Sequence, residues 1–162
     1  MYSSPFPSSQ EYYREHYLIS TDIAKIDVGM VHNFLANESY WAAGIGRETV
    51  ERLLKCALCY GLYDSSGDAL SQIGFARVIT DFASFAYLSD VFILSGHRGR
   101  GLGKWLISSI LAHPDLQNLR KWMLNTKDAH SLYERFGFQL NTEQETYMTY
   151  RPHKLKQREA PA

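Results

Sequence analysis

The segment from residue 98 to residue 104, Arg-Gly-Arg-Gly-Leu-Gly-Lys, combines three glycines with three basic side chains. An apolar run typical of a buried strand precedes it, and an apolar stripe at helical spacing follows it. Such a turn leaves backbone N–H groups unpaired at the positive end of a helix dipole, where phosphate oxygens bind readily. Glycines let the backbone approach an anion closely, and Arg98, Arg100 and Lys104 add positive charge. The segment therefore predicts a phosphate-binding loop.

The spacing of the glycines excludes two common phosphate loops. A Walker loop has four residues between its glycines, followed by Lys and then Ser or Thr. Here three residues separate Gly99 from Gly103, and Trp105 follows Lys104. The dinucleotide fingerprint Gly-x-Gly-x-x-Gly is also absent, since the glycines alternate through Gly101. A glycine cluster alone is equally typical of a helix start that needs a flexible backbone.

Two motifs favour the cofactor interpretation. Arg98-x-x-Gly101-x-Gly103 resembles the [Gln/Arg]-x-x-Gly-x-[Gly/Ala] signature of the GNAT N-acetyltransferases, and it lies between a predicted strand and a predicted helix, as in that family. Further along the chain, Leu132-Tyr133-Glu-Arg-Phe-Gly137-Phe138 resembles the family's Leu-Tyr-x-x-x-Gly-Phe segment. The predicted order of elements is similar to that of the family over roughly residues 17–150.

The resemblance implies an acyl-CoA-dependent N-acyltransferase, in which acetyl-CoA donates its acetyl group to a primary amine by direct attack through a tetrahedral intermediate. It also implies that the main chain of Ile93 and Leu94 holds the pantetheine arm and polarises the thioester carbonyl. Thr126 stands where relatives often carry an asparagine, so its hydroxyl would replace part of one cofactor hydrogen bond. The pyrophosphate would be held by Arg98, Gly99, Arg100, Gly101, Leu102, Gly103 and Lys104.

The candidate acid and base come from two different segments. Tyr133 matches the family's tyrosine general acid, and a phenol of pKa ~10 can protonate a thiolate whose parent thiol titrates near ~8.5; packing beside Phe136 is the alternative role. Asp90 is the candidate base, although on a regular strand it faces away from Tyr87 and Ser89, the side where relatives carry a glutamate. A carboxylate in so apolar a run is either functional or held by backbone hydrogen bonds. A water relay is a further option for the base.

Adjacent aromatics in the loop after the first predicted helix, Tyr40 and Trp41, fall where the family builds the acceptor wall. They suit stacking on a cation or a flat substrate, and anchoring the loop to the core is the alternative. The leading function is acetylation of a small primary amine. A protein N-acetyltransferase and a catalytically silent acyl-CoA-binding regulatory module remain as alternatives, because acceptor loops carry no readable code.

The whole chain predicts an α/β (α+β) fold of the GNAT type, with a mixed, mostly antiparallel sheet of about seven strands and about four flanking helices in the order β-α-α-β-β-β-α-β-α-β-β. We expect a loose N-terminal arm over residues 1–15, one domain over 16–150 and a charged tail over 151–162. Two of the predicted helices are capped by Asp27 and Asp128, the other two span 47–55 and 101–112, and Gly137 ends the last one. The predicted strands span 17–20, 58–63, 71–79, 86–94, 121–125, 138–140 and 147–150.

The charge balance and the cysteine content exclude some classes of partner and ligand. Seventeen basic residues balance seventeen acidic ones, so the excess positive charge of a nucleic-acid binder is absent. Neither a membrane-spanning apolar run nor a signal peptide is evident, and we expect a cytoplasmic protein without a membrane partner. Cys56 and Cys59 have no second pair or nearby histidine pair, so we expect buried thiols and no metal. A homodimer stays open, since dimers are the commonest soluble assembly.

Overall fold

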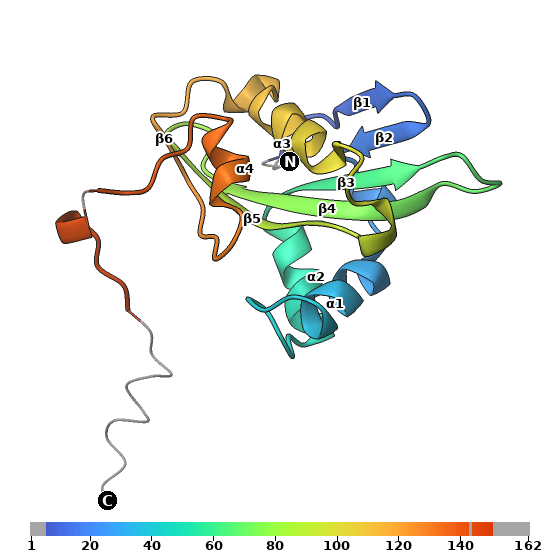
Figure 1. The fold of residues 1–162 in the computed structure, drawn as a ribbon, viewed down its shortest axis with the longest axis horizontal. Coiled ribbons are helices and arrows are strands. Elements are labelled where there is room, and N and C mark those ends of the chain that lie inside the picture. The colour runs from blue at the N-terminus through green and yellow to red at the C-terminus, as the bar shows by residue number, and fades with distance from the viewer. Residues whose placement is uncertain (1–5, 143, 151–162) are drawn as a thin grey trace, which may run out of the picture. The chain divides into compact units, whose positions relative to one another are not determined.

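The computed structural model describes residues 6–142 and 144–150 of the chain, which divides into two compact units, residues 1–127 and 128–162. The first unit is built on a six-stranded sheet in the order β1-β2-β3-β4-β5-β6 (Figure 1). Neighbouring strands are antiparallel except for β5 and β6, which run parallel. The strands are β1 (Glu11–Arg14), β2 (Tyr17–Ser20), β3 (Leu58–Asp64), β4 (Ser71–Thr80), β5 (Phe85–Ile93) and β6 (Lys121–Met123).

Helices cover both faces of this sheet. Helices α1 (Val28–Asn37) and α2 (Arg47–Lys55) lie on one face, and α3 (Leu102–Leu111) lies on the other (Figure 1). Helix α1 begins at the predicted cap, because Asp27 Oδ1 accepts a hydrogen bond from the Met30 amide at 3.0 Å. Three short 3₁₀ turns complete the unit: η1 (Ile23–Lys25), η2 (Ser95–His97) and η3 (Pro114–Leu116).

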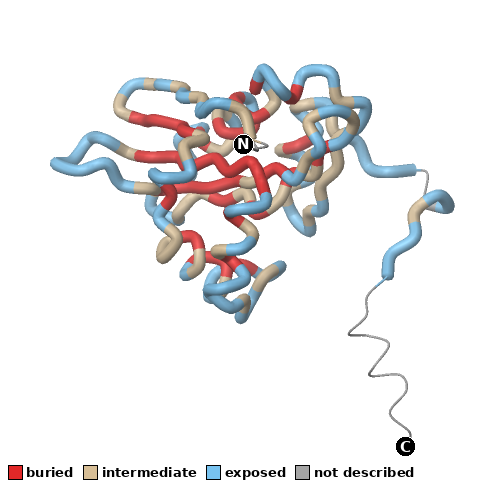
Figure 2. The backbone as a smooth tube through the Cα atoms, turned by 180° about the vertical axis from the view of Figure 1, so that it is seen from behind, coloured by how far each residue is buried: buried red, intermediate tan, exposed pale blue. Residues whose placement is uncertain are grey.

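The apolar core lies on both sides of the central strands, as the buried segments in Figure 2 show. Residues 58–63 of β3 are buried without interruption, which is the pattern of a strand covered on both faces. Under α1 and α2, the rings of Phe34 and Phe92 stack with centroids 3.7 Å apart, and Phe75 packs beside them. Helix α3 buries Leu102, Leu106, Ile107 and Ile110.

The N-terminal segment differs from the expectation of a loose arm over residues 1–15. Glu11–Arg14 form β1, which pairs with β2 from Glu11 opposite Ser20 to Arg14 opposite Tyr17. Glu15 turns the chain between them with φ 55°. The strand escapes a search for apolar periodicity because its side chains are only half-buried at most, and backbone pairing with β2 stabilises it instead. Residues 1–5 and the predicted tail, 151–162, lie outside the described residues.

The second unit contains α4 (His130–Glu134), which begins after Ala129 rather than with a side-chain cap from Asp128. Gly137 follows the helix with φ 87°, as the predicted stop requires. The predicted strands at 138–140 and 147–150 are wrong: over residues 138–142 and 144–150 the structure contains no strand, only a 3₁₀ turn, η4 (Gln144–Thr146). An isolated pair of such short strands is marginally stable at best, so two brief apolar runs do not specify a hairpin.

Candidate active site

Strands β5 and β6 pair over only part of the length of β5. The parallel ladder joins residues 85–87 to Lys121–Met123, and among the described residues the pairing with β6 does not continue to residues 88–93 of β5. A strand edge that loses its partner presents backbone N–H and C=O groups that must find other partners. The opening is therefore suited to a ligand that hydrogen-bonds to main chain.

A β-bulge lies in β5 next to this opening. Phe75 pairs with Phe92, but Arg77 pairs with Ser89, so β5 holds one residue more than β4 over this interval. Asp90 has φ 53°, a left-handed conformation that aspartate tolerates better than most residues. The extra residue brings Asp90 to the side of Arg77 and Ser89. The expectation from a regular strand, in which Asp90 faces away from Ser89, is therefore wrong.

Two side chains hold the carboxylate of Asp90, a residue that is buried. Arg77 Nε donates to Oδ2 in a short ion pair, and Trp41 Nε1 donates to Oδ1 at 2.9 Å. Arg77 also reaches Ser89 Oγ at 3.4 Å. A charged guanidinium partner offsets the desolvation of a buried carboxylate. The donors that hold Asp90 are therefore side chains, not the backbone groups of the non-functional alternative, and its role as a base stays a prediction.

The loop between α1 and α2 contacts both β5 and the segment that follows β6, on the two sides of the opening. Trp41 contacts Asp90 on β5, whereas the Tyr40 hydroxyl accepts a hydrogen bond at 3.0 Å from the amide of Lys127, beyond β6. The two rings meet edge to face with centroids 5.0 Å apart, and they remain 53% and 44% exposed, respectively. Lys127 Nζ lies 5.7 Å from the centroid of the Tyr40 ring. Both aromatics are therefore anchored and still offer accessible surface.

The two predicted main-chain contacts at the end of β5 differ in their availability. The Leu94 amide donates to Ile73 O at 2.8 Å, and Leu94 O accepts from the His97 amide at 2.9 Å. Because amides alternate along an antiparallel strand, the Ile93 N–H points away from β4 and toward the side where β6 has parted. Ile93 O accepts from Arg98 Nε at 2.8 Å. Ile93 is thus oriented toward the opening, while the Leu94 main chain is engaged elsewhere.

The predicted phosphate loop has the backbone shape that anion binding needs. Gly99 and Gly101 have φ values of 77° and 75°, which glycine adopts without strain. The first hydrogen bond of α3 runs from the Trp105 amide to Gly101 O at 3.1 Å. Within the described ranges no backbone hydrogen bond uses the amides of residues 99–104, whereas the Arg98 amide donates to Ser95 O at 3.3 Å. Gly101 leads α3 as its N-terminal cap residue, so these free amides lie at the positive end of that helix.

The basic side chains of the loop are partly committed to the protein. Arg98 holds Ile93 O, and Arg100 donates to the Tyr17 hydroxyl at 3.1 Å and to Gly96 O at 3.3 Å. Lys104 is exposed and forms no ion pair within the described part of the chain. Arg14, which the sequence does not single out, donates from Nη2 to Arg100 O at 3.2 Å. The pairing of β1 with β2 brings Arg14 to the loop as a fourth cation beside Arg98, Arg100 and Lys104.

The other predicted site residues are Thr126 and Tyr133. Thr126 follows β6 in the first unit and is partly buried. Tyr133 belongs to α4 of the second unit, where it is 9% exposed and its ring meets that of Phe138 edge to face at 5.9 Å. Its role as the acid stays a prediction.

In the described ranges, no three His, Cys, Asp or Glu side chains gather in a way that could hold a metal, and no helix there is long and apolar enough to cross a membrane.

Comparison with known proteins identifies the family. Residues 58–140 match the model of the acetyltransferase (GNAT) domain. A Gibberella zeae protein described as a candidate acetyltransferase is 32% identical over 142 residues, which cover 76% of this chain and 79% of the relative. The crystal structure of a candidate GNAT acetyltransferase from Xanthomonas campestris is 43% identical, with a TM-score of 0.78 over 85% of this chain and 94% of its own. A candidate acetyltransferase from Clostridium acetobutylicum that was solved with acetyl-CoA shares the fold at 16% identity, with a TM-score of 0.61 over 85% of this chain and 96% of its own. The free loop amides, the separated strands and these relatives agree: the chain belongs to the GNAT family of acetyltransferases.

Proposed function

We propose that this acetyltransferase moves the acetyl group of acetyl-CoA to a primary amine on a small molecule. One observation carries the proposal: a single segment presents the open N–H of Ile93 and then the free amides of residues 99–104. The Ile93 N–H is a main-chain partner suited to the pantetheine arm, and the loop amides form an anion site suited to the pyrophosphate. The relative from Clostridium acetobutylicum that was solved with acetyl-CoA shares the fold, which adds support for this donor.

The proposed reaction forms one bond and breaks one. The amine lone pair attacks the thioester carbonyl, a C–N bond forms, and the C–S bond breaks as CoA leaves as a thiolate. The Ile93 N–H stabilises the oxyanion of the tetrahedral intermediate. The Tyr133 hydroxyl gives its proton to the thiolate, and the amine releases a proton to water or to Asp90. Tyr133 enters through the family motif, and its near burial suits a phenol that must reach a thiolate in the absence of competing water.

The aromatic loop favours a small acceptor over a protein. A protein substrate needs an open groove along β5 and β6, but Tyr40 and Trp41 join β5 at Asp90 to the segment beyond β6 at Lys127. The exposed faces of the two rings remain available for stacking on an acceptor. A loop that crosses the opening leaves room for a compact amine more readily than for an extended peptide.

Acetyl-CoA turnover against a panel of amines and peptides tests this function. Free CoA thiol and the mass of the acetylated product are measured, and small amines should be acetylated. Turnover restricted to peptides would favour a protein acetyltransferase, and CoA binding without turnover on any acceptor would favour a silent binding module. For the acid, Tyr133→Phe should lower kcat at least about tenfold with little change in the KM for acetyl-CoA. Tyr60→Phe, a buried tyrosine of β3, is the matched control and should retain activity.

A further inference from the structure

The segment between β5 and α3 contacts residues at the ends of three other strands. His97 Nδ1 lies 3.7 Å from Asp64 Oδ2 at the end of β3. Arg100 donates to the Tyr17 hydroxyl at the start of β2, and Arg100 O accepts from Arg14 at the end of β1. His97 and Arg100 thus connect the segment that leads into α3 to β3, β2 and β1.

The contacts between Arg14 and the loop are close and specific. Arg14 Nη2 lies 3.2 Å from Arg100 O, and its Cζ lies 5.8 Å from the centroid of the Trp105 ring. Both Nη atoms lie 3.8 Å from the place where a Cβ on Gly101 would stand. In return, Arg100 reaches Tyr17, whose side chain is 5% exposed. Two arginines therefore connect the β1–β2 hairpin to the loop in both directions.

We propose that the β1–β2 hairpin, which lies outside the residues matched by the family model, is part of the cofactor site, with Arg14 as a positioning residue for the phosphate loop. The inference rests on the proposed use of acetyl-CoA. Arg100 stands between two glycines with left-handed φ, and such a segment loses much conformational freedom on ordering. A contact that orders it beforehand lowers the cost of binding.

The same hydrogen bond acts on an amide that the ligand would use. The carbonyl of Arg100 and the N–H of Gly101 belong to one peptide unit. A charged donor on that carbonyl polarises the unit and strengthens its N–H as a donor. Arg14 thus both fixes the direction of the Gly101 amide and improves it as a partner for a phosphate oxygen.

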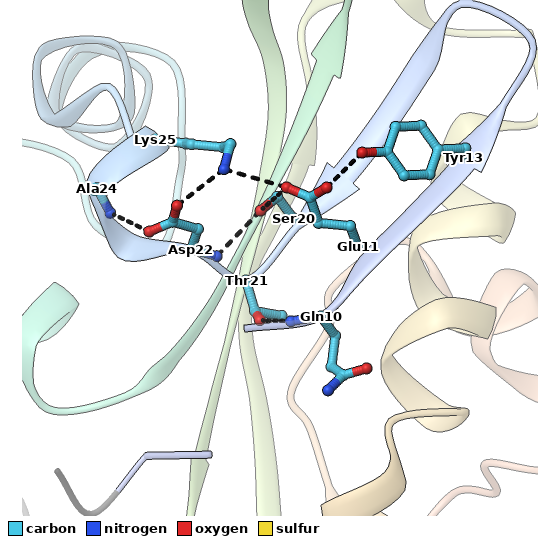
Figure 3. A network of polar contacts seen from close by, with 8 residues as sticks. All are labelled: Gln10, Glu11, Tyr13, Ser20, Thr21, Asp22, Ala24 and Lys25. Carbon is cyan, nitrogen blue, oxygen red and sulfur yellow. Dashed lines mark hydrogen bonds and ion pairs between the residues drawn. The ribbon is translucent and has the colours of Figure 1, made fainter. Parts of the chain in front are cut away.

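The opposite end of the hairpin provides a matched control. There Lys25 Nζ lies 3.1 Å from Glu11 Oε1 and 2.9 Å from Asp22 Oδ2 (Figure 3). This network ties the hairpin to η1 rather than to the phosphate loop. Lys25→Ala therefore removes a cation of η1 and its ion pair with Glu11 of the hairpin, without touching Arg100 or Gly101.

Calorimetry with CoA and kinetics with two acetyl donors test the inference on the full chain. Arg14→Ala should raise the Kd for CoA about tenfold or more, the effect expected for one charge-assisted hydrogen bond. Arg14→Lys should recover part of the loss, because it keeps the charge but not the planar fork. With S-acetylpantetheine, which lacks the phosphates, kcat/KM of Arg14→Ala should equal that of the wild type. Lys25→Ala should bind CoA normally.

Three results would overturn the inference while leaving the proposed function intact. The first is an Arg14→Ala variant that binds CoA within twofold of wild type. The second is an Arg14→Ala variant that loses as much activity with S-acetylpantetheine as with acetyl-CoA. The third is a Lys25→Ala variant that loses as much CoA affinity as Arg14→Ala. Circular dichroism establishes that each variant is folded, and Arg14→Lys carries the comparison if Arg14→Ala is not. A wild-type chain that binds no CoA would instead refute the proposed function and this inference with it.

Discussion

Replacing Asp90 with alanine removes one half of a buried ion pair and leaves the other half in place. The Arg77 side chain is 12% exposed and the Asp90 side chain 5% exposed, so water cannot readily solvate the remaining guanidinium. Breaking such a pair from one side typically costs about 3–5 kcal/mol. At about 2–4 °C per kcal/mol for a domain of this size, we expect Asp90→Ala to lower Tm by about 6–20 °C.

A double variant separates the ion pair from the other contacts of Asp90. Arg77→Met combined with Asp90→Ala leaves no unpaired charge, and apolar replacement of a buried pair is often close to neutral. The double variant should therefore melt well above Asp90→Ala, and calorimetry or circular dichroism measures both. Single variants that each shift Tm by less than about 2 °C, or a double variant whose loss equals the sum of the singles, would refute a buried, mutually dependent pair.

The same residue allows a test of the predicted base. Asp90→Asn keeps the shape and an oxygen acceptor for the Trp41 N–H, and asparagine tolerates the left-handed φ at this position. If Asp90 is the base, kcat should fall at least about tenfold in a variant that stays folded. A kcat near that of wild type, together with a raised KM for the acceptor, would assign Asp90 to holding Trp41 instead.

Four further outcomes are expected. Gly101→Val should abolish the thermal shift caused by acetyl-CoA, because a β-branched residue resists φ 75° and crowds the anion site; an unchanged shift would exclude the loop. Trp41→Ala should raise the acceptor KM several-fold while the Kd for CoA changes little, and loss of CoA binding would show a structural anchor. Burial lowers the pKa of His113, opposed in part by Asp115, so below about pH 6.5 the unfolded chain binds a proton that the folded chain does not. The free energy of unfolding should therefore fall between pH 7.5 and 5.5, by up to about 1.4 kcal/mol per pH unit, and denaturant titrations of His113→Gln should lack this slope. Iodoacetamide at pH 8 should modify exposed Cys56 and spare Cys59, whose thiol pKa burial raises to about 12, and peptide mass spectrometry distinguishes the two.

Those cysteines illustrate the limit of reasoning from residue type. Both were expected to be buried, but Cys56 directly follows the last residue of α2 and is exposed, whereas Cys59 lies within buried β3. Burial of a small side chain depends on which face its element presents to neighbours, and three positions along the chain suffice to reverse it. Free cysteine being usually buried is a tendency that does not decide a particular site.

Local features of this chain follow from short-range sequence. The Asp27 cap, the span of α2 at residues 47–55 and the stop at Gly137 all agree with expectation. Each depends on contacts within about one helical turn or on the steric freedom of a single glycine. The family motifs are of the same kind, since a loop and the helix that follows it are adjacent in the chain.

The tertiary structure alone decided the features that join distant segments. Arg14 meets Arg100 across 86 residues, and Trp41 meets Asp90 across 49. Strand β1 exists through its pairing with β2, and one extra residue in β5 moves Asp90 to the other face. Strand pairing and bulges are set by backbone partners elsewhere in the sheet, and a shift of one residue reverses every side chain that follows. No local pattern of residue types records that choice, which is why the sequence predicted the phosphate loop but not the hairpin that holds it.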